Sequence, residues 1–98
     1  MESDKSLIKV SAKSHPTSVA GAIAKTIRDK LRADVQAIGA GAVNQAVKAI
    51  AISVNYLKDD KIVISCVPYF VETEIEGSER TAIRFEIKGT ELEPKQKS

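Results

Sequence analysis

The stretch that decides the fold is IGAGAVNQAVKAIAI, residues 38–52, in which a short apolar strand leads through a glycine pair into an alanine-rich helix. Apolar residues recur at helical spacing over residues 42–57, so we expect an amphipathic helix there. Gly39 and Gly41 leave backbone N–H groups uncovered at the start of this helix, where they and the helix dipole favour an anion. Close packing of the helix on a sheet explains the same two glycines, and it is the simpler interpretation.

Before this stretch, the chain shows the pattern of a strand, a helix and a second strand. Residues 7–12 alternate between apolar and polar side chains, which is typical of a half-buried strand. Apolar residues then recur at helical spacing over residues 19–31, and Thr17 or Ser18 can cap that helix. Residues 34–39 are apolar enough for an interior strand, and the intervening helix makes it parallel to the first strand.

Beyond the second helix, two strands complete the pattern. Residues 61–75 are rich in β-branched side chains and predict a strand that Pro68 interrupts. Because proline cannot donate to a ladder, this strand lies at an edge or bulges at Pro68. Alternation over residues 80–88 predicts its antiparallel partner. The order β-α-β-α-β-β indicates an α/β protein of the α+β two-layer type, with two helices on one face of a four-stranded mixed sheet.

The composition suits one compact domain. The chain has 98 residues, of which 43% are hydrophobic, and its formal net charge of +2 is too small for binding nucleic acid by bulk charge alone. We expect residues 1–6 to be a flexible N-terminus, residues 7–88 the domain and residues 89–98 a flexible polar tail. The lone Cys66 cannot form an intramolecular disulfide and no apolar run spans a membrane, so we expect a cytoplasmic protein.

A second apolar stripe on the helix over residues 42–57 predicts a subunit interface. Ala49, Ile52 and Tyr56 form this stripe beside the one that covers the sheet. A helix that is apolar over more than one face usually needs a second partner. We therefore expect a homodimer or a higher homo-oligomer.

The sequence does not provide the residue clusters of a catalytic or metal site. His15 is the only histidine, so no catalytic or metal site built around several histidines can form, and we expect His15 to be an ordinary loop residue. Cys66 lies in an apolar strand, where a small buried thiol is expected rather than a nucleophile. We therefore predict no enzymatic activity, no catalytic residue, no metal and no cofactor.

Lysines and side-chain amides are the candidate contacts for nucleic acid. Lys9 and Lys13 can neutralise phosphates, although exposed lysines usually serve only as solvated surface. Asn44 and Gln45 lie in the first turn of the second helix, where their amides can bond phosphate, ribose or base edges. The same two residues can instead cap the helix or face water.

Four segments resemble the bacterial stage V sporulation protein S family: KVSAKS at residues 9–14, SVAGA at 18–22, QAIGAGAVNQAVKA at 36–49 and GSERTAI at 77–83. That family is similar to the Alba chromatin and RNA-binding proteins, whose β-α-β-α-β-β subunits pair as dimers. The resemblance implies an Alba-like fold that binds nucleic acid with its first loop, the start of its second helix and a long hairpin. Lys13 in the first loop is the position onto which phosphate binding carries over.

The sequence departs from the Alba pattern at two places. Ala40 and Ala42 stand where Alba proteins have arginines around the glycine before the second helix. The hairpin, which is basic in Alba proteins, is acidic here and carries Glu72, Glu74, Glu76 and Glu79. Because carboxylates repel phosphates, we expect this hairpin to point away from nucleic acid or to meet a basic protein partner.

Two functions remain open from the sequence. The first is a small regulator of development or sporulation that binds DNA or RNA mainly through electrostatic contacts with phosphates. Its predicted contacts are Lys9, Lys13, Ser14, Gly39, Gly41, Asn44 and Gln45. The alternative is a protein-interaction adaptor that uses the acidic hairpin and the second helix without nucleic acid.

Overall fold

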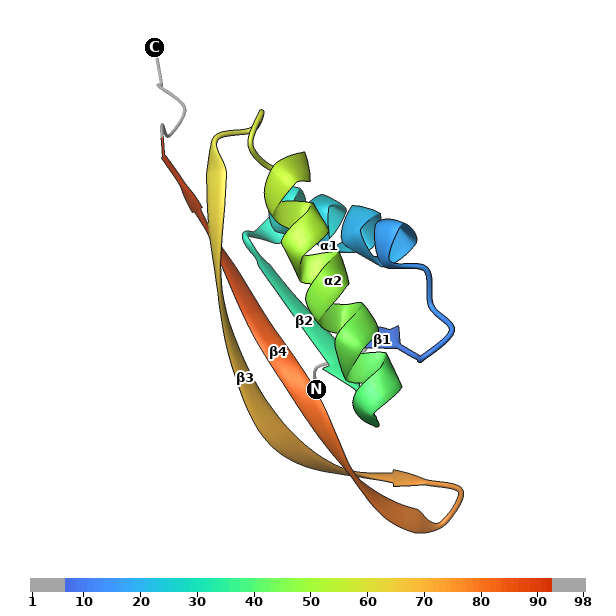
Figure 1. Ribbon diagram of the computed structural model, residues 1–98. Coiled ribbons are helices and arrows are strands. Elements are labelled where there is room, and N and C mark those ends of the chain that lie inside the picture. The colour runs from blue at the N-terminus through green and yellow to red at the C-terminus, as the bar shows by residue number, and fades with distance from the viewer. Residues whose placement is uncertain (1–6, 93–98) are drawn as a thin grey trace.

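A computed structural model describes residues 7–92 and shows two helices and a four-stranded sheet (Figure 1). The strands lie in the order β1-β2-β4-β3, in which β1 and β2 are parallel and the other two pairs are antiparallel. This mixed sheet confirms the predicted fold class and the parallel βαβ unit. In chain order the elements are β1 (Leu7–Val10), α1 (Pro16–Lys30), β2 (Arg32–Ala37), α2 (Ala40–Tyr56), β3 (Ile62–Ile75) and β4 (Ser78–Glu91).

Both helices lie on the same face of the sheet, and the hydrophobic core fills the space between the two layers (Figure 1). On this helix face Val35 of β2 pairs with Phe85 of β4, and both side chains are buried. Ile23 and Ile27 of α1 are fully buried above them. Because side chains alternate along a strand, the neighbouring residues point to the opposite side of the sheet, here called the open face, which neither helix covers.

Both helices begin earlier than their apolar spacing predicts. α1 begins at Pro16, with His15 as the N-cap residue, so the prediction that Thr17 or Ser18 caps this helix is wrong. Proline fixes a helical φ and lacks the N–H that the first turn would leave unbonded, so it starts the helix itself. α2 begins at Ala40, directly after Gly39, whose φ of 93° is a conformation that glycine adopts readily.

The two parallel strands are displaced slightly from their predicted ranges. β1 ends at Val10 instead of residue 12, because the chain turns at residues 11–14 with a bond from the Ser14 N–H to the Ser11 carbonyl. β2 covers Arg32–Ala37 instead of residues 34–39. The chain needs the last two residues of the predicted strand to reach the start of α2.

The hairpin formed by β3 and β4 is continuous and extends beyond the helices (Figure 1). β3 is an edge strand, as predicted, and Pro68 does not interrupt its register with β4. The strands are joined by Glu76 and Gly77, whose positive φ angles of 52° and 79° are typical of a two-residue hairpin turn.

β4 extends into the segment predicted as a polar tail, which began at residue 89. The strand ends at Glu91, and the N–H of Gly89 donates to the Leu31 carbonyl at 3.0 Å. A Cβ at Gly89 would lie 2.8 Å from Cγ2 of Ile27, so this segment is packed against the core. The predicted N-terminal segment, residues 1–6, and the rest of the predicted tail, residues 93–98, lie outside the described residues.

One residue predicted at a subunit interface belongs to the core of this chain instead. Ala49 is fully buried, because α2 packs along α1 as well as on the sheet. Ile52 is partly buried against the core, whereas Tyr56 is exposed. The large apolar side chains that α2 exposes are therefore Val47, Val54 and Tyr56.

Candidate nucleic-acid interface

Loop one, residues Ser11–His15, presents Lys13 at the corner of a turn that is held by its own hydrogen bonds. The Ser14 N–H donates to the Ser11 carbonyl at 3.0 Å, and the Ser11 N–H donates to Ser14 Oγ at 2.9 Å. The N–H of Lys13 itself donates to Ser11 Oγ at 3.2 Å. The backbone of Lys13 is thus held in place while its side chain is exposed.

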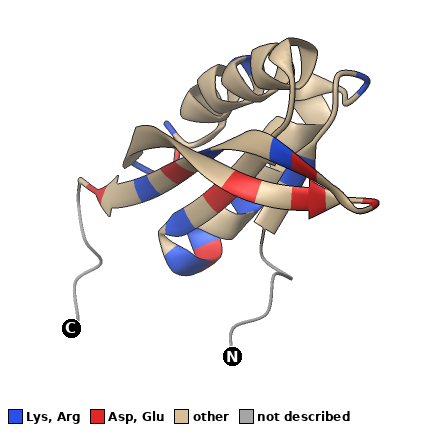
Figure 2. Cartoon of the chain, turned by 90° about the horizontal axis from the view of Figure 1, so that it is seen from below, with Lys and Arg blue, Asp and Glu red and all other residues tan. Residues whose placement is uncertain are grey.

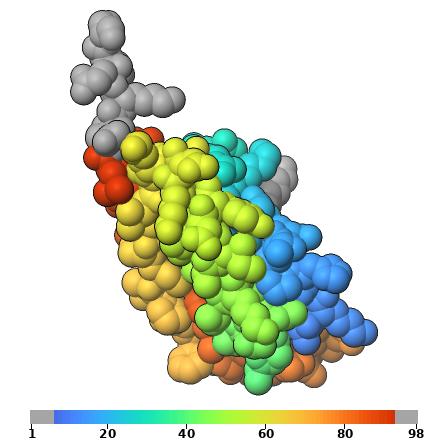
Figure 3. Space-filling model, turned by 45° about the horizontal axis from the view of Figure 1, so that its top comes forward, coloured from blue at the N-terminus to red at the C-terminus, as the bar shows by residue number. Residues whose placement is uncertain are grey.

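Loop one packs directly on the start of α2. Nε2 of Gln45 donates to the carbonyl oxygen of Ser14 at 2.9 Å, a bond between residues 31 positions apart. A Cβ at Gly41 would lie 2.9 Å from Cβ of Ala12, closer than real Cβ atoms approach. Gly41 therefore allows the close approach of loop and helix, which Figure 3 shows as the blue surface beside the green one. Gln45 and Ser14, both predicted as contacts for nucleic acid, are brought together.

The N-termini of α1 and α2 face the solvent near this contact, and neither helix has an acidic residue in its first turn. His15 and Gly39, the N-cap residues of α1 and α2, make no side-chain cap bond, and the first turns contain no Asp or Glu. The helix dipoles give both ends a partial positive charge, although Pro16 contributes no N–H to the first turn of α1 and the Ser18 N–H donates to the His15 carbonyl. Together with the Lys13 ammonium, they make this edge of the molecule attractive to phosphate.

The outer surface of α2 continues the site. Asn44 is exposed in the second turn of the helix, and the exposed Lys48 follows it four residues later. Residues four apart lie side by side on a helix, so an amide and an ammonium share one surface there. Lys48 was not among the predicted contacts, although its spacing from Asn44 is visible in the sequence.

Lys9 lies apart from the other predicted contacts. It pairs with Gln36 of β2, and this row of side chains belongs to the open face of the sheet. The other six predicted contacts lie in loop one or at the start of α2. Here the six residues with Lys48 are called the loop-one surface: Lys13, Ser14, Gly39, Gly41, Asn44, Gln45 and Lys48.

The end of the hairpin carries negative charge. The side chains of Glu72, Glu74, Glu76 and Glu79 are all exposed, and the red bands of Figure 2 follow the hairpin to its tip. Glu74 and Glu79 face each other in the β3–β4 register, so two like charges meet there. The exposed carboxylates therefore repel phosphate from the outer side of the hairpin tip.

Neither the thiol nor the acidic side chains form a reactive centre in the described part of the chain. Cys66 is partly buried, and burial raises the pKa of its thiol, so the thiol stays protonated at neutral pH. Within residues 7–92, no three His, Cys, Asp or Glu side chains gather into a group that could hold a metal. Neither α1 nor α2 has the length and apolar character that crossing a bilayer requires.

Comparison with known protein families gives a match that covers most of the chain. The sequence model described as stage V sporulation protein S (SpoVS) matches residues 6–90. The matched range contains loop one, both helices, the first three strands and all but the last residue of β4. The chain therefore belongs to the stage V sporulation protein S family.

Proposed function

We propose that this protein is a non-enzymatic regulator that binds DNA or RNA by contacting phosphates with the loop-one surface. The observation that carries the proposal is the bond from Gln45 to the Ser14 carbonyl, which fixes the turn bearing Lys13 beside the start of α2. An ammonium held next to two uncapped helix N-termini is suited to the phosphate backbone, because all three features favour anions.

The binding is mainly electrostatic and depends little on sequence. Lysines and backbone N–H groups contact phosphates, which all nucleic-acid sequences share. Asn44 and Gln45 add amides that can bond ribose or base edges, although Gln45 already uses Nε2 in its bond to loop one. Weak sequence preference and strong salt dependence follow from this division of contacts.

Family membership supports a role in sporulation, because the family is named for stage V of that process. We propose a cytoplasmic protein that acts on gene expression during development. A binder of phosphate backbones with little sequence preference acts on many sites at once, so a chromatin-like or RNA-binding role suits it better than the control of one operator.

The working form that we propose is a homodimer. α2 exposes Val47 and Val54, which are 51% and 43% accessible, and the neighbouring hairpin exposes Phe70, which is 74% accessible. Large apolar side chains gathered on a surface favour association. A twofold dimer would present two loop-one surfaces to one nucleic acid and so raise the affinity.

A second candidate function follows from the acidic hairpin. Its four exposed glutamates extend beyond the helices, where a basic protein could reach them without touching the loop-one surface (Figures 1 and 2). In this alternative the chain is an adaptor that recruits a basic partner and does not bind nucleic acid. The charge of the hairpin gives the alternative its support.

Direct titration distinguishes the two functions. Fluorescently labelled duplex DNA and single-stranded RNA are titrated with the protein between about 50 and 200 mM salt, the range over which phosphate contacts weaken strongly. We expect binding whose affinity falls steeply with salt for every sequence tested. Absence of binding at the lowest salt would reject the proposed function and leave the adaptor.

A further inference from the structure

A cavity of about 340 Å³ lies on the open face, between the carboxyl ends of β1 and β2 and the hairpin. Its volume is within the range of small-ligand pockets. Lys9 and Gln36 pair with each other in the β1–β2 register, and both line the cavity. Strand alternation places Thr73 and Ile75 on this same side of the hairpin.

Gln36 lines this cavity and has an unused donor. The residue is only 8% exposed, and Oε1 accepts hydrogen bonds from Nε and Nη2 of Arg84 at 3.1 and 2.5 Å. Arginine has only donors, so the oxygen must face Arg84, and Nε2 is the amide atom left for another partner. Among the described residues, Nε2 has no hydrogen-bond acceptor.

The amide nitrogen is nevertheless accessible to a ligand. Within residues 7–92, every side-chain nitrogen or oxygen that is fully enclosed has a hydrogen-bond partner. Nε2 of Gln36 has none, so it must keep some accessible surface. The cavity that Gln36 lines provides that access.

Lys9 is the basic residue that lines the cavity. It makes no ion pair with the described residues, so its ammonium is available to an anion. Asp34 and Glu86, the acidic residues next to Gln36 on the open face, both form ion pairs with Arg32. The nitrogen–oxygen distances are 3.4 and 2.9 Å.

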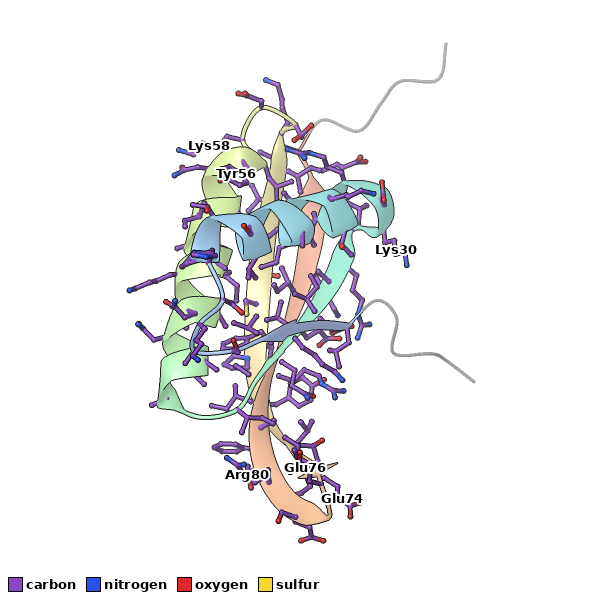
Figure 4. All side chains as sticks on the ribbon, turned by 90° about the vertical axis from the view of Figure 1, so that its right-hand side faces the viewer. Lys30, Tyr56, Lys58, Glu74, Glu76 and Arg80 are labelled. Carbon is purple, nitrogen blue, oxygen red and sulfur yellow. The ribbon has the colours of Figure 1, made fainter. Side chains whose placement is uncertain are left out.

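One acidic residue also lines the cavity, namely Glu74. Alternation turns its side chain to the opposite side of the strand from Thr73 and Ile75. Figure 4 shows Glu74 and Glu76 at the outer end of the hairpin. The residues that line the cavity therefore include an ammonium, an amide N–H and a hydroxyl, which are donors that an anion can use.

We infer that this cavity binds a terminal phosphate group, carried by a free mononucleotide or by the end of a nucleic-acid strand. A terminal phosphate presents several acceptor oxygens to donors that converge from different directions, and it pairs well with the point charge of a lysine. The site goes beyond the proposed function, because inorganic phosphate alone can occupy it without any contact to the loop-one surface.

The first experiment titrates the full chain with inorganic phosphate and follows its ¹⁵N NMR spectrum at constant ionic strength. We expect the side-chain amide signal of Gln36 to shift in a saturable way. Lys9→Met and Gln36→Glu should each weaken binding about tenfold or more, since each removes a donor to the anion. Gln36→Glu keeps an oxygen for Arg84, so the fold is retained, and the spectrum itself checks this.

Lys25→Met is the matched control, because it removes one exposed lysine of α1 that lies outside the cavity. Its phosphate affinity should equal that of the unmodified protein. A Gln36 signal that does not saturate, or equal losses in Lys9→Met and Lys25→Met, would overturn the inference. The proposed function would stand in that case, since it depends on oligonucleotide binding by Lys13.

A second titration identifies the source of the phosphate. Adenosine 5′-monophosphate is compared with two thymidine oligonucleotides of equal length, one with a 5′-phosphate and one with a 5′-hydroxyl. Tighter binding of the phosphorylated strand, lost in Gln36→Glu, assigns the site to strand ends. Tighter binding of the mononucleotide than of inorganic phosphate, with both strands equal, assigns it to free nucleotides. If neither the mononucleotide nor the phosphorylated strand shifts the Gln36 amide signal, the inference fails.

Discussion

Gln45 of α2 donates from Nε2 to the backbone carbonyl of Ser14 at 2.9 Å, and this bond fastens loop one to the helix that starts beside it. The bond joins the two parts of the loop-one surface that come from distant parts of the chain. It also leaves the Lys13 side chain free for a ligand, because the bond uses the backbone of its neighbour. The position of Lys13 therefore depends on a residue of another element.

Gln45→Leu tests this dependence. Loss of one hydrogen bond should lower the free energy of unfolding by about 1 kcal/mol, and nucleic-acid affinity should fall although Lys13 is still present. Chemical denaturation and oligonucleotide titration measure the two effects. Asn55→Leu makes a comparable change on the exposed far end of α2 and should leave affinity unchanged. Equal affinity in both variants would show that the bond does not position the site.

Lys13→Ala tests the phosphate contact itself. The variant should bind all sequences more weakly by a similar factor, and the slope of log affinity against log salt should decrease by about one ion. Titrations at several salt concentrations measure this slope. Lys25→Ala, which removes an exposed lysine of α1 outside the loop-one surface, is the control. A loss confined to one sequence would instead indicate base recognition.

The periodicity of the sequence predicted most of the fold, because alternation and helical spacing record which side chains meet the core. Val35 and Phe85 were placed in strands for this reason, and the structure pairs them. Strand ends were less predictable, since β1 stops where Ser11 and Ser14 bond each other instead of a neighbouring strand. That competition depends on local hydrogen bonds that periodicity does not record.

The candidate site was only partly predictable. Lysines and amides could be recognised by type, but the bond between Gln45 and Ser14 joins segments whose distance depends on the whole fold. Ala49 was predicted at a subunit interface because the sequence pattern does not show that α1 packs against α2. In the structure, α1 covers this residue. The position of Lys9 beside Gln36 depends on the β1–β2 register, which no local pattern specifies.

Gly41→Ala tests the close packing of loop one on α2. The new Cβ would lie 2.9 Å from Cβ of Ala12, which cannot rotate away, so the loop must shift. We expect overpacking to cost about 1–3 kcal/mol of stability, partly offset by the better helix propensity of alanine, and to weaken nucleic-acid binding. Thermal denaturation and titration measure both effects.

Gly21→Ala is the matched control for that variant. Gly21 lies in α1, and no heavy atom lies within 4 Å of the position of its Cβ. The same substitution should therefore stabilise the protein by up to about 1 kcal/mol and leave binding unchanged. If Gly41→Ala behaved like Gly21→Ala, Gly41 would not be needed for the approach of the loop.

Val54→Asp tests the proposed dimer. Val54 is 43% exposed on α2, so a carboxylate there is solvated in the monomer and the fold should be kept, whereas burying it in an interface is costly. Light scattering should show a dimer for the unmodified protein and a monomer for the variant. Ala22→Asp places the same group on an exposed position of α1 and should remain dimeric. A monomeric unmodified protein would contradict the proposal.

The acidic hairpin provides a test of where nucleic acid lies. Glu72 and Glu76 are exposed near the hairpin turn, and replacing both with lysine changes the net charge by four without removing buried contacts. If duplex DNA binds the loop-one surface, the hairpin only repels it, so the double variant should bind more tightly and with a steeper salt dependence.

Asp59→Lys with Glu91→Lys is the control, because it makes the same charge change at the opposite end of the hairpin strands. The increase in DNA affinity should be smaller for this variant. Weaker binding by the hairpin variant would mean that the glutamates themselves contact the ligand, and the assignment of the interface to Lys13 would then be wrong.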